Sequence, residues 1–126
     1  MKIKGTETSK PANVRKSKRI DYYSKIYCTK SIQEGRTEEY DVPIELMLIN
    51  ISIGGLGIIS ERIFEKDTVL VLDLKLEEVK YEKVYAKVMW VMKMGDMYRH
   101  GLEIFNVSGR LYKHLGALDN SIKTTV

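Results

Sequence analysis

The sequence has few of the residues that cross-link a small protein or bind a metal. It contains one cysteine, Cys28, and two histidines among 126 residues. One cysteine cannot form an internal disulfide, and without a second cysteine or clustered histidines it cannot complete a zinc site. We therefore expect neither a disulfide scaffold nor a cysteine-based metal fold.

Long apolar runs are also missing. Lys, Glu or Asp interrupts every hydrophobic stretch before it reaches the roughly 18 residues that a membrane helix needs. The basic start of the chain, residues 1–6, lacks the apolar block of a secretory signal. We therefore expect a protein without a membrane span, located in the cytoplasm.

The length and composition suit one domain. With 44% hydrophobic and 30% charged residues, the chain has enough apolar material for a single core and lies outside the range of disordered proteins. Polar residues without apolar periodicity occupy the start. We expect a flexible basic N-terminal tail at 1–13, one domain at 14–120 and a C-terminal tail at 121–126.

The net charge of +4 is distributed unevenly along the chain. Residues 1–19 hold seven basic residues and one acidic residue, a net charge of +6, so the remainder carries −2. A mildly acidic domain therefore follows a strongly basic leader. An electrostatically recruited partner should be an anion that meets the N-terminal end.

Apolar and polar residues alternate along most of the domain, as they do in strands with one buried face. Six strands are predicted, at 20–32, 39–53, 56–59, from 69 onward, 79–92 and 97–107. Pro43 indicates an edge or a bulge in the second of them. The period then changes, because Leu111, Leu115 and Leu118 have helical spacing after a possible N-cap at Ser108.

Short antiparallel connections between six strands favour a closed or nearly closed barrel, which leaves few exposed edges. There is no alternation of strands and helices of the kind that builds parallel α/β enzymes. The predicted fold class is all-β: a six-stranded antiparallel barrel with a short C-terminal helix.

The first local pattern with chemical meaning is Arg15-Lys16-Ser17-Lys18-Arg19, where the tail meets the first strand. A spacing of four places both guanidinium groups on one side of an extended or a helical segment. Arginine binds phosphate through two parallel hydrogen bonds and stacks on nucleobases. On its own, such a pentapeptide is more often a solvated surface segment.

The second pattern is Asn50-Ile51-Ser52-Ile53-Gly54-Gly55, at the end of the second strand. In a regular strand Asn50 and Ser52 share one face and the two isoleucines share the other, so the polar pair can face a ligand while the apolar pair enters the core. Gly55 can adopt positive φ and has no side chain to block an approaching ring or phosphate. The alternative is a polar strand end that closes with a glycine turn.

Together the two patterns resemble the PilZ domain family. An Arg-x-x-x-Arg is followed about thirty residues later by Asn-x-Ser-x-x-Gly and then by a late strand, 98–105, that reads YRHGLEIF. The resemblance extends from residue 14 to about residue 107. It implies a six-stranded β-barrel with a C-terminal helix that binds the bacterial second messenger cyclic di-GMP.

The resemblance also implies a role for each motif residue. Arg15 and Arg19 would grip phosphate and guanine, Asn50 and Ser52 would hold a guanine, and Gly55 would permit close approach. Asn50 replaces the commoner aspartate. An amide both donates and accepts hydrogen bonds but lacks the carboxylate charge, so affinity for the ligand could be lower.

The remaining distinctive residues have structural explanations that we favour. Trp90 could stack on a base, but core packing is the commoner role of a tryptophan in an apolar strand. Core packing is also favoured for the methionines around the Gly95-Asp96 turn. Cys28 is expected to be a small buried hydrophobe. The two histidines lack the neighbours that metal ligands or general bases need.

Three functions remain open at this point. The leading one is a non-enzymatic cyclic di-GMP receptor whose leader becomes ordered on binding and which signals through an unidentified protein partner. The second is a PilZ-like adaptor that contacts proteins without nucleotide. The third, a general nucleic-acid binder, predicts steep salt dependence and fits poorly with an acidic barrel, so no specific DNA or RNA is expected. An enzyme is the least favoured reading, because no base, nucleophile and electrophile can be assembled, and no cofactor or metal is expected.

Overall fold

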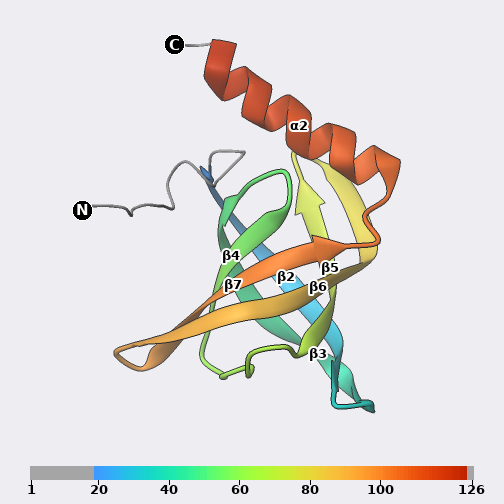
Figure 1. The fold of residues 1–126 in the computed structure, drawn as a ribbon, viewed down its shortest axis with the longest axis vertical. Coiled ribbons are helices and arrows are strands. Elements are labelled where there is room, and N and C mark those ends of the chain that lie inside the picture. The colour runs from blue at the N-terminus through green and yellow to red at the C-terminus, as the bar shows by residue number, and fades with distance from the viewer. Residues whose placement is uncertain (1–18, 125–126) are drawn as a thin grey trace, which may run out of the picture.

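The structure, a computed structural model, describes residues 19–124, with side chains described as far as residue 118. The chain forms six strands and one helix in a simple sequential order (Figure 1). They are β2 (Ile20–Gln33), β3 (Arg36–Ile51), β4 (Gly55–Ser60), β5 (Val69–Leu76), β6 (Val79–Met94), β7 (Met97–Phe105) and α2 (Gly109–Thr124).

The six strands close into an antiparallel barrel in the order β2-β3-β4-β7-β6-β5, which confirms the predicted fold class. Pairing of β2 with β5 closes the ring, where Cys28 lies opposite Leu72. Closure leaves none of these six strands as a free edge. Pro43 lies in an irregular stretch of the β2–β3 pairing, where Cys28 pairs with Ile44 but Lys30 pairs with Glu39, so the predicted bulge is confirmed.

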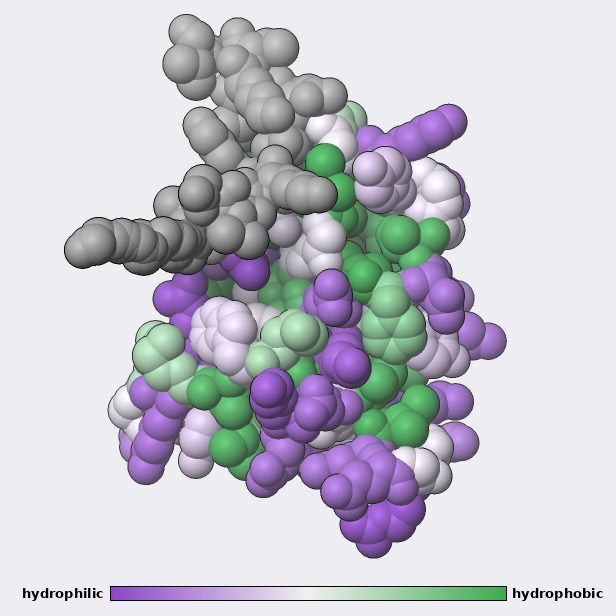
Figure 2. All heavy atoms as spheres, viewed as in Figure 1, coloured by the Kyte–Doolittle hydropathy of each residue, from purple (hydrophilic) through white to green (hydrophobic). Residues whose placement is uncertain are grey.

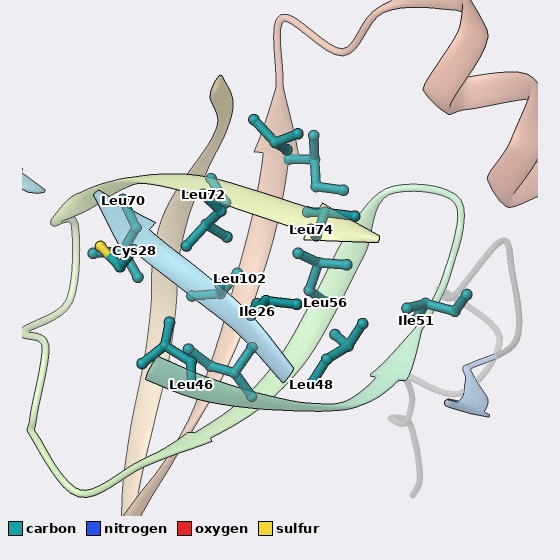
Figure 3. Close-up of a cluster of buried hydrophobic side chains, with 14 of the residues drawn as sticks. Ile26, Cys28, Leu46, Leu48, Ile51, Leu56, Leu70, Leu72, Leu74 and Leu102 are labelled. Atoms are coloured by element: carbon teal, nitrogen blue, oxygen red, sulfur yellow. The ribbon is translucent and has the colours of Figure 1, made fainter. Parts of the chain in front are cut away.

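Inward-facing side chains from every strand fill the barrel (Figure 3). The largest fully buried side chains, two of them from α2, are Ile26, Leu46, Leu48, Ile51, Leu56, Ile58, Leu70, Leu72, Leu76, Leu102, Leu111 and Leu115. Burying a Leu or Ile side chain contributes about 1.5–3 kcal/mol, so these residues dominate the stability of the fold.

Helix α2 lies across one end of the barrel (Figure 1). Its first turn is capped as predicted, because the Leu111 backbone N–H donates to Ser108 Oγ over 3.1 Å. Leu111 and Leu115 are buried in the barrel core. Within residues 19–124 no helix combines the length and apolar character required to cross a membrane.

A chain of side-chain contacts also fastens α2 to the β5–β6 turn. His114 Nδ1 lies 2.6 Å from the Tyr81 hydroxyl, and His114 Nε2 lies 2.9 Å from Glu77 Oε1. The Tyr81 and His114 rings meet edge to face. His114 therefore holds the helix in place against the barrel.

Two β-bulges reverse the inward and outward alternation of their strands. In β3, Leu48 pairs with Ile58 but Asn50 pairs with Gly57, so Ile49 is an extra residue. In β6, Val88 pairs with Leu102 but Trp90 pairs with Gly101, so Met89 is an extra residue. Each extra residue turns the following side chain to the opposite face.

Candidate ligand-binding site

The structure brings the two sequence motifs together on the outside of the barrel. Arg19 immediately precedes β2, and its Nη1 donates a hydrogen bond to Asn50 Oδ1 on β3 over 2.9 Å. Arg15, the other arginine of the first motif, lies outside the described residues. A guanidinium group and an amide thus meet where the first strand begins and the second one ends.

Asn50 faces outward because of the bulge at Ile49. Leu46 and Leu48 point into the core, so strict alternation would also direct Asn50 inward. After the bulge Asn50 lies on the outer face, and Ile51 is fully buried in its place. The expectation that Ile51 enters the core is confirmed, whereas the Asn50 side chain is only 7% exposed.

The predicted strand continues to Ile53, but Ser52 and Ile53 lie beyond the end of β3. Strand β3 ends at Ile51, and Ser52 forms a tight turn in which its N–H donates to the Gly55 carbonyl over 3.0 Å. Ile53 lies in this turn and is only half-buried. The predicted alternation therefore fails beyond Ile51, and backbone hydrogen bonding of the turn sets the position of Ser52.

Gly55 is required by packing and not by a positive φ. Among the residues with a described backbone, the glycines with positive φ are Gly35 and Gly95. A Cβ at Gly55 would lie 2.6 Å from the backbone oxygen of Leu102 on β7. Any larger residue at Gly55 would therefore push β4 away from β7, next to the site.

Two further glycines shape this surface, and neither belongs to the two sequence motifs. Gly57 of β4 pairs with Gly101 of β7. A Cβ at Gly57 would lie 2.5 Å from Asn50 Oδ1, so the amide of Asn50 occupies the space above this glycine. The signal in the sequence was a glycine inside a strand, which often marks a close approach.

Trp90 covers the second of these glycines. A Cβ at Gly101 would collide with the Nε1, Cε2 and Cζ2 atoms of the indole. The residue is 39% exposed, so the predicted core position of Trp90 is wrong. The bulge at Met89 is the reason, because without it Trp90 would follow Val84, Ala86 and Val88 into the barrel.

The methionines near the β6–β7 turn are also exposed, contrary to the favoured core-packing interpretation. Met89, Met92 and Met94 are 40%, 51% and 42% exposed. The hairpin extends beyond the barrel core in Figure 1, and in Figure 2 pale atoms are mixed with purple, hydrophilic ones in this part of the molecule. These side chains give the outer face beside Trp90 a deformable apolar character.

The cysteine and the histidines lie elsewhere. Cys28 is fully buried, as predicted, and burial raises the pKa of its thiol to about 11. His100 is buried as well, where its Nε2 accepts a hydrogen bond from the Phe64 backbone N–H over 3.0 Å and burial lowers its pKa. Within residues 19–124 no three His, Cys, Asp or Glu side chains gather as a metal site.

A hollow on the barrel lies apart from the motif residues. That hollow, of about 570 Å³, is formed by residues of β2, β5 and β6. Its lining consists of Ser24, Lys25, Tyr27, Asp73, Leu74, Lys75, Lys80, Tyr81 and Glu82. None of its lining residues belongs to either motif. Cationic and carboxylate side chains are mixed in the lining, whereas an anion site needs a clear excess of cations.

The outer face of β3 and β4 has the chemistry to bind a flat polar ring and an anion. Arg19 provides planar cationic donors, and Asn50, although only 7% exposed, provides a group that both donates and accepts hydrogen bonds. A flat ring with a polar edge can bind here by hydrogen bonds to the amide and by stacking on the guanidinium group.

Comparison with known proteins gives a consistent family and fold. A family model described as PilZ domain matches residues 13–118. No curated protein matches the chain. A solved structure of YcgR in complex with c-di-GMP from Escherichia coli is similar in fold, with a TM-score of 0.63 and 14% identity. The match covers 88% of this chain and 46% of that one, so the chain spans about half the length of that YcgR protein.

A second solved structure, the PilZ domain with c-di-GMP of YcgR from Escherichia coli, has a TM-score of 0.57 and 14% identity. It covers 88% of this chain and 92% of that one. The fold likeness therefore extends over almost the whole of a PilZ domain.

Proposed function

The chain belongs to the PilZ domain family, and from that premise we propose that it is a receptor for cyclic di-GMP. The observation that carries the proposal is the hydrogen bond from Arg19 to Asn50, which joins the two motifs on one outer face. The two solved structures described above are of YcgR with c-di-GMP, which supports the choice of ligand.

The chemistry of the site suits this ligand. Cyclic di-GMP carries two phosphates and two guanines. Arg15 and Arg19 supply charge and planar donors for phosphate and guanine, whereas Asn50 and Ser52 supply hydrogen bonds to a guanine edge. Gly55 has no side chain and is assigned to permit close approach of the ligand. Binding without turnover is the expected chemistry of this arrangement.

Signal output is proposed to pass through the leader and a protein partner. The leader, residues 1–19, carries +6 and the rest of the chain −2, so a ligand with two phosphates would draw the leader toward the site. Ordering of residues 10–19 would then present a new surface to the partner. Its entropy cost would lower the net affinity for the ligand.

Isothermal titration calorimetry with cyclic di-GMP, GTP and linear di-GMP tests the ligand. We expect saturable binding of cyclic di-GMP and much weaker binding of the other two. Equal binding of all three, lost steeply with salt, would identify a general nucleic-acid or polyanion binder. No binding of any would support the adaptor function.

Hydrogen exchange of residues 10–19 tests the output separately. Protection of these amides should increase when cyclic di-GMP is added. Unchanged exchange, in a protein that binds the nucleotide, would refute the ordering of the leader while leaving the receptor function in place.

A further inference from the structure

Resting on this proposed function, we propose that Asp21 selects guanine, because its carboxylate accepts hydrogen bonds from the N1–H and N2–H groups of one base of cyclic di-GMP. Neither sequence motif contains Asp21, and neither contains a carboxylate. The proposal therefore adds an acidic residue of β2 to a site whose other groups are cationic or neutral.

The cross-strand register places Asp21 beside Asn50. The two residues pair between β2 and β3, and the adjacent pair, Ile20 with Ile51, points inward, because Ile51 is fully buried. Successive residues of a strand alternate between its two faces, so Asp21 projects from the outer face of the barrel. Directly paired residues hold their Cβ atoms about 5 Å apart, so one base can reach both side chains.

Arg19 provides a plane for the base beside this carboxylate. It lies two residues before Asp21 and therefore projects toward the same face. Its guanidinium donates to Asn50 Oδ1 over 2.9 Å, which holds the group between the start of β2 and the end of β3. A guanidinium plane stacks on a nucleobase, so a base that lies on Arg19 can direct its polar edge toward Asp21.

Asn50 alone does not meet the hydrogen-bonding needs of a guanine. It is only 7% exposed, and its oxygen already accepts the bond from Arg19. Its NH₂ group can donate to the guanine acceptors O6 and N7, but the N1–H and N2–H groups need acceptors. A carboxylate has two acceptor oxygens and no donor, so it matches two neighbouring N–H groups.

The Asp21 carboxylate is accessible to a ligand. Its side chain is exposed, and the ion pairs between described residues use glutamates elsewhere on the barrel. A negative charge at this position repels a phosphate and attracts a base edge that carries N–H donors. Asp21 therefore also determines which part of the ligand faces β2, namely a base and not a phosphate.

The test is calorimetry of the full chain with cyclic di-GMP and with cyclic di-IMP, which lacks the N2 amino groups. Both ligands carry the same phosphates, so a general effect of charge changes both affinities by the same factor. The wild type should bind cyclic di-GMP more tightly than cyclic di-IMP. Asp21→Asn should weaken cyclic di-GMP binding by about 10-fold or more, as loss of a hydrogen bond to a charged group does, and cyclic di-IMP binding by less. The preference for guanine should therefore shrink in this variant.

Asp41→Asn is the matched control. It removes the same charge from an exposed position of β3, away from the end of the strand where Asn50 lies, so it should leave both affinities unchanged. An unchanged preference for guanine in Asp21→Asn, in a protein that binds cyclic di-GMP, would overturn the role of Asp21 and leave the receptor function standing. Failure of the wild-type protein to bind either dinucleotide would instead refute the receptor function, and this inference with it.

Discussion

Arg19 and Asn50 are thirty-one residues apart in the chain, and a 2.9 Å hydrogen bond from the Arg19 guanidinium to the Asn50 amide oxygen joins them. The bond links the start of β2 to the end of β3 on the outer face of the barrel. It orients both side chains before a ligand arrives, so less conformational entropy should be lost on binding.

The first prediction concerns this pair. Arg19→Ala and Asn50→Leu should each weaken cyclic di-GMP binding by about 1.5–3 kcal/mol, the range for hydrogen bonds to charged groups. Because the two groups share one bond, their effects should not add in the double variant. Calorimetry on the four proteins of this cycle measures the coupling.

Asn50→Asp is the conservative control for the pair. A carboxylate also accepts the hydrogen bond from Arg19, and its charge strengthens that bond, so this variant should retain binding. Full affinity in the double variant Arg19→Ala with Asn50→Leu would show that the nucleotide binds elsewhere.

The second prediction concerns Gly57, which both motifs omit. A Cβ at this position would lie 2.5 Å from Asn50 Oδ1, so the amide must rotate away and the bond to Arg19 must break. Gly57→Ala should therefore weaken nucleotide binding by about 1–3 kcal/mol. It should change stability by less than about 1 kcal/mol, because a rotating side chain can yield more easily than the backbone can.

Gly54→Ala is the matched control. Nothing lies within 4 Å of a Cβ at Gly54, and its backbone φ is not positive. This variant should bind cyclic di-GMP as the wild type does. Equal loss of affinity in both variants would mean that added bulk anywhere near the turn disturbs the site, and that the Asn50 amide is not the cause.

The sequence was sufficient to predict the barrel, because alternation of apolar side chains is a direct consequence of strand geometry. Strands β2 and β6 begin at the predicted residues, and Ser108 caps α2 as expected. Bulges were harder to predict. One extra residue changes no composition and interrupts no apolar run, yet it reverses the face of every later residue in the strand.

Trp90 shows the consequence most clearly. Its parity with Val84 and Val88 predicts burial, and only the pairing of β6 with β7 reveals the extra residue at Met89. Asn50 was assigned to the surface from its chemistry, although Leu46 and Leu48 have the same parity. Pairing between strands is a tertiary property, so local sequence patterns do not determine it.

The third prediction concerns the Cys28 thiol. Cys28 is fully buried, its Sγ–H donates to the Lys30 carbonyl over 3.3 Å, and burial raises its pKa to about 11. The thiolate is the reactive form, so at pH 8 the folded protein should react very slowly with Ellman's reagent. Addition of urea to unfold the chain should release one fast-reacting thiol. A fast reaction in native buffer would contradict burial.

The last prediction concerns His100 and the pH dependence of stability. Burial lowers the pKa of His100, and its Nε2 accepts a hydrogen bond from the Phe64 N–H, which a protonated ring could not accept. Above the ordinary histidine pKa of about 6.5, the ring is neutral in both folded and unfolded chains and contributes no pH dependence. Below it, the unfolded chain binds a proton that the folded chain resists, so stability should fall as pH falls from about 6.5 toward the lowered pKa.

Urea denaturation of the wild type and of His100→Gln at pH 7.5 and pH 5.5 measures this effect. Glutamine keeps an acceptor for the Phe64 N–H but does not titrate, so the variant should lose less stability between the two pH values than the wild type. It should be less stable than the wild type at pH 7.5, by about 1–3 kcal/mol, because its amide fits the buried acceptor position imperfectly.

The other described histidine, His114, provides the control, since His114→Gln should retain the His100-dependent loss. Equal losses in wild type and His100→Gln would assign the pH dependence to other groups, because carboxylates that lose ion pairs on protonation also lower stability in acid.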